Sequence, residues 1–519
     1  MPVDFPRHFS CFLQHQSLPM IAYLVGMTTF FERPEWPRRL GWGILLLGVL
    51  VRLKVYVQNR SLFLDEANLS RNIVERDWTA FFRALDYQQY APPGYLILNK
   101  LSVGLIGPGE YGLRLIPLLS SVALLWVVYA LAKRLIAARW VQLLPLFLTA
   151  FSYEMIRYGT ENKQYSLDTL LTTLLVALAL HWTPDRLGRR GLFLWALLGA
   201  ATVWFSMPIV FTLAGVGLYY GYAFLRKQDY RRLGGLLLVI GSWLLSFGVY
   251  YWVLLRPDIE SDYLNTYHQA YFLPLPPQSS EEWAQLGHLL LGLVHHTVGF
   301  TVVAYVVGGA ALLWGMVVLG RRYPSRLILL GIPVLTCLLA SALEQYSLLP
   351  RLTLFYTPLL ALLMGIGTNH LWSWRNWAPW VCLLLWLPVL PLKGGLYYLY
   401  APFEVEDTRR VLRAAHDAGE GMLIYVHHEA VPAAVYYRDY HPDSLAFRQK
   451  EMYLSHWDET PDTLRSKDDA SFWTVYSHLI NAHTRTEMQE QVEKLKDWAE
   501  RRAETSTTGA RALRWEKKK

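Results

Sequence analysis

Long apolar runs separated by short polar segments set the pattern of the first 400 or so residues. Runs such as 112–132, 233–255 and 352–371 reach the length of about 20 residues that a helix needs to cross a bilayer. Backbone polar groups must be satisfied within lipid, and runs this continuous favour helices over barrel strands. About eleven spanning helices are predicted, at 40–56, 111–131, 139–153, 166–182, 192–206, 208–225, 233–255, 298–319, 327–343, 352–371 and 377–398.

Lys and Arg cluster at alternate ends of these runs, for example at Arg38-Arg39, Lys133-Arg134 and Arg321-Arg322. The positive-inside rule puts such clusters in the cytoplasm. The N-terminal end of the first span is therefore predicted to lie inside, and the chain is predicted to leave the last span on the outside. Between the first two spans, residues 68–99 are amphipathic and rich in aromatic side chains, which indicates a segment along the membrane interface.

From about residue 401 the composition changes to that of a soluble domain. The pattern predicts a small α/β domain on the outer side, and the absence of a glycine-rich phosphate loop leaves lid, acceptor platform or scaffold as its roles. The chain is thus divided into an N-terminal extension (1–36), a transmembrane domain (37–400) and a soluble domain (401–519). In the soluble domain the predicted elements are helices at 404–418, 430–437 and 485–502 and strands at 422–427 and 472–478.

Composition agrees with a multi-pass membrane protein, since 53% of the 519 residues are hydrophobic and only 17% are charged. The net charge of +8 resides mostly in the clusters between apolar runs, so it does not indicate nucleic acid as a partner. Cys11, Cys337 and Cys382 form neither a disulfide framework nor a metal knuckle. His295-His296 and His427-His428 are adjacent pairs for which a structural role is favoured over metal binding.

Three polar clusters are predicted to meet on the outer face: Asp65-Glu66 after the first span, the hairpin 157–165, and residues 344–351. A carboxylate can act as a general base or ligate a divalent cation, while Arg and Lys at the bilayer edge can hold a lipid phosphate. The combination predicts a site at the boundary of water and lipid. Such a site could pass a polar group from a lipid-phosphate carrier to an acceptor outside.

Each cluster also has a purely structural interpretation. An Asp-Glu pair after a membrane span is typical of a solvated loop. Arg157 and Glu161 stand at i and i+4, the spacing of a local helical ion pair. Arg351, at a helix start, is typical of an interfacial anchor.

Four stretches resemble bacterial members of glycosyltransferase family 39, which contains protein O-mannosyltransferases and lipid A aminoarabinose transferases. They are LDEA at 64–67, YAPPGYL at 90–96, RLIP at 114–117 and RYGTENKQYSL at 157–167. The resemblance covers roughly residues 40 to 200, extends more weakly through Arg351, and includes the soluble domain, which is similar to the extracytoplasmic domain of many bacterial relatives.

The resemblance implies a GT-C fold in the bacterial plasma (inner) membrane, with a polyprenyl-phosphate sugar as donor and a protein, lipid or glycan acceptor outside the cytoplasm. It makes Asp65 the candidate catalytic carboxylate, with Glu66 as a supporting group or cation ligand. Metal use varies in the family, so a divalent cation stays open as a cofactor. The candidate substrate-binding residues are Arg157, Glu161, Lys163, Tyr165 and Arg351.

Two alternatives remain beside the glycosyltransferase. A transporter or flippase of a lipid-linked sugar would carry polar residues near mid-membrane and show internal repeats, whereas here charges gather at span ends. A polymerase or ligase of surface polysaccharide would share the chemistry and differ in its acceptor. The sequence leaves the sugar, the acceptor and the stereochemical outcome open.

Overall fold

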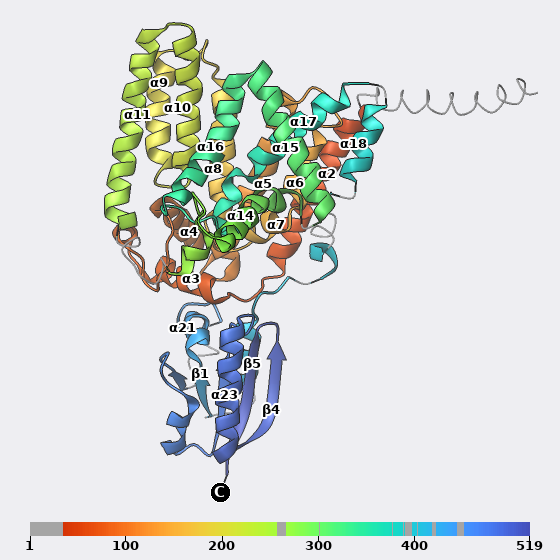
Figure 1. Ribbon diagram of the computed structural model, residues 1–519. Coiled ribbons are helices and arrows are strands. Elements are labelled where there is room, and N and C mark those ends of the chain that lie inside the picture. The colour runs from red at the N-terminus through yellow and green to blue at the C-terminus, as the bar shows by residue number, and fades with distance from the viewer. Residues whose placement is uncertain are drawn as a thin grey trace, which may run out of the picture.

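The computed structural model describes residues 35–256, 266–299, 301–375, 377–387, 389, 397–401, 403–417, 422–443 and 451–518. A helical body lies above a small sheet domain, which carries the C-terminus (Figure 1). Of the predicted N-terminal extension, residues 1–34 and with them Cys11 lie outside the described residues, and residues 35 and 36 already belong to the first described helix, α2.

Within the described residues, seven helical segments are long and apolar enough to cross a bilayer, and each coincides with a predicted span. The prediction of a multi-pass helical membrane protein is confirmed. The segments are α2 (Glu35–Val57), α5 (Glu110–Leu135), α10 (Ile209–Arg226), α11 (Tyr230–Tyr250) with its continuation η2 (Tyr251–Leu255), α15 (Val302–Arg322), α16 (Pro324–Ala342), and η4 (Pro350–Tyr356) with α17 (Thr357–Trp372).

The other predicted spans contain shorter helices. The run at 139–153 is interrupted at Ser152, whose hydroxyl accepts the Met155 backbone N–H and starts a new helix. Most of the second half of the run at 377–398 lies outside the described residues. The helices are α6 (Leu143–Phe151), α7 (Tyr153–Tyr158), α8 (Tyr165–His181), α9 (Arg189–Thr202) and α18 (Ala378–Trp386).

Two regions lie between the predicted spans. The amphipathic segment 68–99, predicted to follow the membrane interface, contributes to α3 (Leu64–Glu75), η1 (Trp78–Phe82) and α4 (Pro93–Ile106), near the sheet domain (Figure 1). Between the predicted spans 233–255 and 298–319 the structure contains a further helix, α14 (Ser280–Val298), which the sequence pattern did not predict. This helix packs against α15 and α17. Its first turn contains Glu281 and Glu282, which lowered the apparent hydropathy of the segment.

The sheet domain has five strands in the order β2-β1-β3-β5-β4. The predicted α/β class is confirmed, with β1 parallel to β2 and β3, and β5 antiparallel to β3 and β4. The strands are β1 (Leu423–Val426), β2 (Met452–Leu454), β3 (Ser471–Tyr476), β4 (Ala499–Thr507) and β5 (Ala510–Lys517), and the helices are α20 (Thr408–Asp417), α21 (Val431–Asp439) and α23 (Ala482–Trp498).

The predicted helix at 485–502 is wrong at its C-terminal end. Helix α23 stops at Trp498, and the next residues enter β4. This strand is highly charged and largely exposed, so its sequence lacks the apolar alternation that marks a half-buried strand. It pairs with β5 through a tight turn in which Gly509 has a φ of +65°, a conformation that glycine adopts without strain.

The sheet domain and the helical body share one hydrophobic core. Leu62, Leu69 and Tyr95 of the body belong to the same buried cluster as Val411 and Tyr436 of the sheet domain. Helix α21 packs directly against α3. The sheet domain is therefore held against the segment that carries the Asp65-Glu66 pair.

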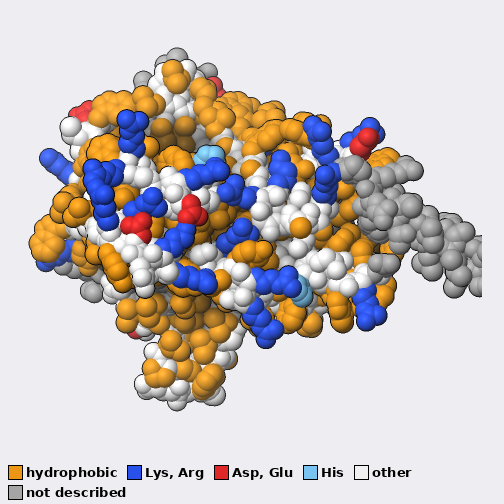
Figure 2. Space-filling view, turned by 90° about the horizontal axis from the view of Figure 1, so that it is seen from above, with side chains coloured by type: hydrophobic (Ala, Val, Ile, Leu, Met, Phe, Trp, Pro, Cys, Tyr) orange, Lys and Arg blue, Asp and Glu red, His pale blue; other side chains and the backbone are white. Residues whose placement is uncertain are grey.

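The end of the helical body far from the sheet domain is strongly basic. Figure 2 views this end from above and shows many Lys and Arg side chains among apolar ones, with few Asp or Glu. Helices α5, α10 and α15 each carry Lys or Arg in their last turn. Lys and Arg at the ends of spans are what the positive-inside rule describes for the cytoplasmic face of a membrane protein.

Helices α15 and α17 approach so closely that side chains are excluded between them. A Cβ atom on Gly315 would lie 2.0 Å from the Leu363 carbonyl oxygen, whereas one on Gly309 of the same helix would meet nothing within 4 Å. We expect Gly315→Leu to destabilise the protein by about 1–3 kcal/mol through overpacking. The measurement is the midpoint of thermal unfolding in detergent, with Gly309→Leu as the matched control. Equal midpoints for the two variants would contradict the close packing.

Candidate functional site

The candidate site begins at the first turn of α3, where Asp65 and Glu66 are adjacent. Carboxylates in the first turn of a helix interact favourably with the partial positive charge of its N-terminus. Successive residues of an α-helix point about 100° apart, at 3.6 residues per turn. The two side chains therefore have different surroundings: that of Asp65 is 31% exposed, and that of Glu66 is completely buried.

Glu66 is bound on both carboxylate oxygens by Arg114 of α5. The Arg114 Nε and Nη2 atoms donate to Oε1 and Oε2 at 2.8 and 2.6 Å. Oε1 also accepts the backbone N–H of Asn162 at 2.7 Å. The remaining Arg114 donors reach the carbonyl oxygens of Arg60 and Ser61 at 2.6 and 3.1 Å. Glu66 and Arg114 thus join α3, α5, the loop before α3 and the hairpin 157–165.

Asp65 faces two cations from distant parts of the chain. Its Oδ2 atom lies 3.3 Å from Nη1 of Arg351, in η4. Burial raises the pKa of Asp65, but the charges of Lys163 and Arg351 outweigh burial and hold the pKa below its usual value. Asp65 is therefore ionised at neutral pH. Three predicted site residues, Asp65, Lys163 and Arg351, are brought together.

Lys163 is buried, and its ammonium group donates to the side-chain oxygen of Gln89 at 2.7 Å. Burial lowers the pKa of Lys163, while the carboxylate of Asp65 opposes this shift. Because one hydrogen bond leaves two ammonium protons for other acceptors, Lys163 can still donate to an anionic ligand.

Arg157 and Glu161 form the local ion pair that their spacing predicts, with Nε and Oε2 3.2 Å apart. The Arg157 guanidinium also lies over the ring of Tyr158, 5.1 Å from its centre. Tyr165, at the start of α8, packs edge-on against the same ring and is buried. These three predicted residues share the hairpin with Lys163, and Tyr165 also lies close enough to Arg351 and Asp65 to interact with their charges.

Arg60 is a candidate that the sequence analysis missed. Its side chain is buried, and its Nε and Nη2 atoms have no hydrogen-bond partner among the described residues. Its Nη1 atom reaches Thr160 Oγ1 at 3.3 Å, so the guanidinium lies against the hairpin. The guanidinium also lies over the ring of Phe403, 4.9 Å from its centre. Buried N–H groups without a hydrogen bond are costly, and an anionic ligand could accept from Nε and Nη2. The sequence did contain a signal for Arg60. It is a basic residue that follows the first span on the predicted outer side, whereas Arg38 and Arg39 precede that span on the predicted inner side.

Glu110, the first residue of α5, binds side chains of the sheet domain. Its buried carboxylate accepts hydrogen bonds from Tyr437 at 2.9 Å and Arg409 at 2.8 Å, and lies 3.0 Å from Nε2 of His441. The Tyr437 hydroxyl also accepts the backbone N–H of Leu62 at 2.7 Å. The loop before α3 is therefore fixed from the sheet-domain side as well as by Arg114.

The sheet domain also brings an imidazole toward Asp65. The Nδ1 atom of His478, just after β3, lies 2.6 Å from the buried carboxylate of Glu406. The hydrogen bond with Glu406 raises the pKa of His478, and the charges of Glu406, Glu429 and Asp65 add to the shift. The sequence showed no signal for this, because Glu406 and His478 lie in different predicted elements.

Metal-binding groups do not surround Asp65 in the part of the chain that the structure describes. The group of three His, Cys, Asp or Glu residues that could hold an ion lies instead in the sheet domain, at His427, His428 and Glu487. His295, on α14, contacts the Tyr305 hydroxyl at 2.9 Å, and the side chain of His296 lies outside the described residues.

Comparison with solved structures identifies the fold. A crystal structure of ArnT from Cupriavidus metallidurans in the apo state superimposes with a TM-score of 0.50 at 16% sequence identity, over 92% of this chain and 98% of that chain. The predicted GT-C glycosyltransferase fold is thereby confirmed.

Two further solved structures are similar. ArnT from the same organism bound to undecaprenyl phosphate gives a TM-score of 0.49 at 15% identity, over 91% of this chain and 98% of that chain. The Archaeoglobus fulgidus oligosaccharyltransferase in complex with Zn and sulfate gives 0.48 at 13% identity, over 91% of this chain and 72% of that chain. Neither the protein-family models nor the curated proteins that were searched match the sequence.

Removing the charge of Glu66 leaves Arg114 buried without its partner. Breaking a buried ion pair in this way costs about 3–5 kcal/mol, so we expect Glu66→Gln to lower the midpoint of thermal unfolding markedly. The matched control is Glu75→Gln on the same helix, which removes a partly exposed pair with Arg71 worth about 0.3–0.5 kcal/mol. If the Glu66→Gln variant were no less stable than the Glu75→Gln variant, the ion pair of Glu66 with Arg114 would not be a major source of stability.

Proposed function

We propose that the protein is a membrane glycosyltransferase that moves a sugar from a polyprenyl-phosphate carrier to an acceptor outside the cytoplasm. The observation that carries the proposal is the grouping of ionised Asp65 with Lys163 and Arg351 beside the first turn of α3. A carboxylate next to cations provides the two kinds of group that transfer from a sugar phosphate requires. The GT-C fold supports the same reaction class by analogy.

Asp65 is proposed as the catalytic carboxylate. Its ionised oxygen accepts a hydrogen bond from the acceptor hydroxyl or amine and takes the proton as the acceptor bonds to the anomeric carbon. The bond between that carbon and the phosphate oxygen breaks, and its electron pair stays on the carrier phosphate. Glu66 is proposed as a positioning residue rather than a group that touches substrate, because Arg114 and the Asn162 N–H occupy its carboxylate.

The cations are proposed to hold the carrier phosphate. Negative charge grows on the phosphate as the sugar leaves, and fixed positive charge stabilises it most in a site shielded from water. Lys163 and Arg351 lie beside Asp65. Arg157 begins the hairpin 157–165 that contains Lys163, and Arg60 lies against this hairpin. Glu161 and Tyr165 are proposed to orient this group, through the ion pair with Arg157 and through packing on Tyr158.

The Lys and Arg side chains at the end of the helical body far from the sheet domain support an orientation in the membrane. The basic end seen in Figure 2 is proposed to face the cytoplasm, which puts the site and the sheet domain on the outer side. We infer the plasma membrane of a bacterium from the resemblance in the hairpin and around Asp65. The sheet domain, which contacts the loop before α3, is proposed to close the site toward the acceptor.

Loss of the Asp65 charge tests the proposal directly. Envelope glycans, lipids and glycoproteins from bacterial cells with and without the protein are compared by mass spectrometry to find the product. We expect Asp65→Asn to reduce its formation by at least about 100-fold, within the range that general-base groups contribute. The control is Asp77→Asn, an exposed carboxylate at the other end of α3. Product formation by Asp65→Asn at the wild-type rate would contradict the assignment.

The reaction class is tested in proteoliposomes with the fluorescent lipid-linked sugar that the product identifies. Transfer forms a glycosidic bond and frees the carrier phosphate, whereas a flippase changes only the leaflet in which the lipid resides. Movement between leaflets without bond formation would overturn the proposal.

The lowered pKa of Asp65 predicts the acid side of the pH profile. A carboxyl whose folded pKa is depressed stays ionised until the pH falls through that lowered value. We expect the ionisation of Asp65 to leave transfer unaffected between about pH 5 and 8, since the unperturbed pKa of Asp is about 3.9. Replacing Lys163 with Met removes one source of the depression. The acid limb of the residual rate should then move to higher pH, and an unchanged limb would argue against Asp65 as the titrating group.

A further inference from the structure

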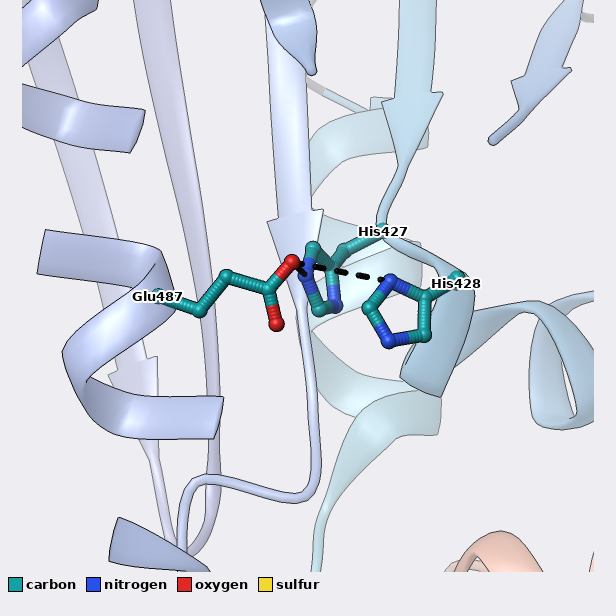
Figure 3. A group of neighbouring side chains, drawn as sticks. All are labelled: His427, His428 and Glu487. Carbon is teal, nitrogen blue, oxygen red and sulfur yellow. Dashed lines mark ion pairs between the residues drawn. The ribbon is translucent and has the colours of Figure 1, made fainter. Parts of the chain in front are cut away.

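Three potential metal ligands meet at one edge of the sheet domain. His427 directly follows β1, His428 starts the short helix η5 (His428–Ala430), and Glu487 lies on α23. Figure 3 shows the Glu487 carboxylate pointing at both imidazoles from across the end of the sheet. The three residues lie at the carboxyl ends of the parallel strands β1 and β3, where the chain leaves the sheet. Binding residues are often found on such connecting segments.

The spacing of the ligand atoms is that of a metal site. The Glu487 Oε1 atom lies 3.2 Å from His427 Nε2 and 3.8 Å from His428 Nδ1, and one ligand atom from each residue falls within 4.8 Å of the others. Bonds of about 2.0–2.1 Å at tetrahedral angles separate neighbouring ligand atoms of zinc by roughly 3.3 Å. The two distances to Glu487 Oε1 therefore lie within about half an ångström of that spacing.

Hydrogen bonding does not account for the cluster. His427 is completely buried, and neither its Nε2 atom nor Nδ1 of His428 has a hydrogen-bond partner among the described residues. The contact with Glu487 is close, but its angle is not that of a hydrogen bond. A buried polar nitrogen without a hydrogen bond is costly, and an ion bound between the imidazole and the carboxylate would remove that cost.

We propose that His427, His428 and Glu487 bind a divalent transition-metal ion of the zinc type. The ligands are Nε2 of His427, Nδ1 of His428 and Oε1 of Glu487. Imidazole and carboxylate together suit zinc and its neighbours in the first transition row. His428 and Glu487 are each 23% exposed, so one side of the site is open to a fourth ligand. His483 precedes Glu487 by four residues on α23, and hence lies on the same face of that helix.

Each imidazole binds a metal in its neutral form, through a ring nitrogen that carries no proton. Binding through Nε2 places the ring proton of His427 on Nδ1. That atom now receives the Glu429 backbone N–H at 3.4 Å, a contact longer than most hydrogen bonds, so its loss costs little.

The ion would cross-link α23 to the end of β1. The same edge carries the segment after β3, where the Ser477 hydroxyl donates to the Glu429 carbonyl oxygen at 3.2 Å and His478 follows. Bound metal is therefore expected to stabilise the edge of the sheet domain that approaches Asp65. This inference does not depend on the glycosyltransferase proposal.

The test uses the full chain in detergent, with its affinity tag removed because a polyhistidine tag binds zinc itself. After treatment with a chelator, the protein is titrated with Zn²⁺ against a chromophoric competitor, and thermal unfolding is recorded with and without Zn²⁺. We expect one tight site per chain and a higher unfolding midpoint with metal. Co²⁺ in place of Zn²⁺ should give the visible absorption of a low-coordinate site with nitrogen and oxygen ligands.

Variants locate the site. We expect His428→Ala and Glu487→Gln each to weaken Zn²⁺ binding by at least about 100-fold, since loss of a direct ligand exceeds the 10–100-fold effect of an outer-shell change. Both replace partly exposed side chains, and their unfolding midpoints without metal report whether they fold. His416→Ala, elsewhere in the sheet domain, is the control. Binding that is absent from the wild type, or unchanged in both variants, would overturn the proposal.

Discussion

The buried pair of Glu66 and Arg114 is the interaction on which the rest of the site depends. Two charges taken out of water are costly, and their attraction offsets the cost only when geometry is good and the remaining donors and acceptors are filled. Here the contact is bidentate, and Arg60, Ser61 and Asn162 contribute further backbone groups. Because these groups come from four separate segments, the pair fixes the start of α3 relative to the helical body and to the hairpin.

Adjacent carboxylates acquire different properties from this arrangement. Glu66 points into the body and has its oxygens occupied, whereas Asp65, one position earlier, stays partly exposed. Lys163 and Arg351 keep Asp65 ionised despite its burial. A partly exposed carboxylate is thus held next to cations by a neighbouring carboxylate whose own oxygens are occupied.

The sheet domain is part of the same structure and not a tethered appendage. Its residues share a hydrophobic core with α3 and α4. Arg409 and Tyr437 of the sheet domain also donate hydrogen bonds to Glu110, at the start of α5. Of the roles considered for this domain, scaffold and lid both agree with these contacts. A metal at His427, His428 and Glu487 would stabilise the end of the sheet nearest to the site. Like the shared core, it would help to hold the sheet domain in place beside α3.

The sequence by itself determined the properties that depend on neighbouring residues. Hydropathy predicted the seven long spans, alternation of elements predicted an α/β domain, and charge bias grouped Asp65, the hairpin and Arg351 at one end. The shared motifs also indicated the fold. These features are visible because span length and charge at span ends are local consequences of burial in lipid.

Only the tertiary structure decided which side chains meet. Asp65 and Glu66 have different surroundings because α3 turns Glu66 toward Arg114. Two guanidinium nitrogens of Arg60 lack a hydrogen bond only because the folded chain buries them. Glu487 joins the two histidines only because α23 packs on the sheet. The exposed, charged β4 was missed for the same reason, since it is a strand through its pairing with β5. Contacts between distant segments leave no periodic signal in either partner, so they emerge only when the chain is folded.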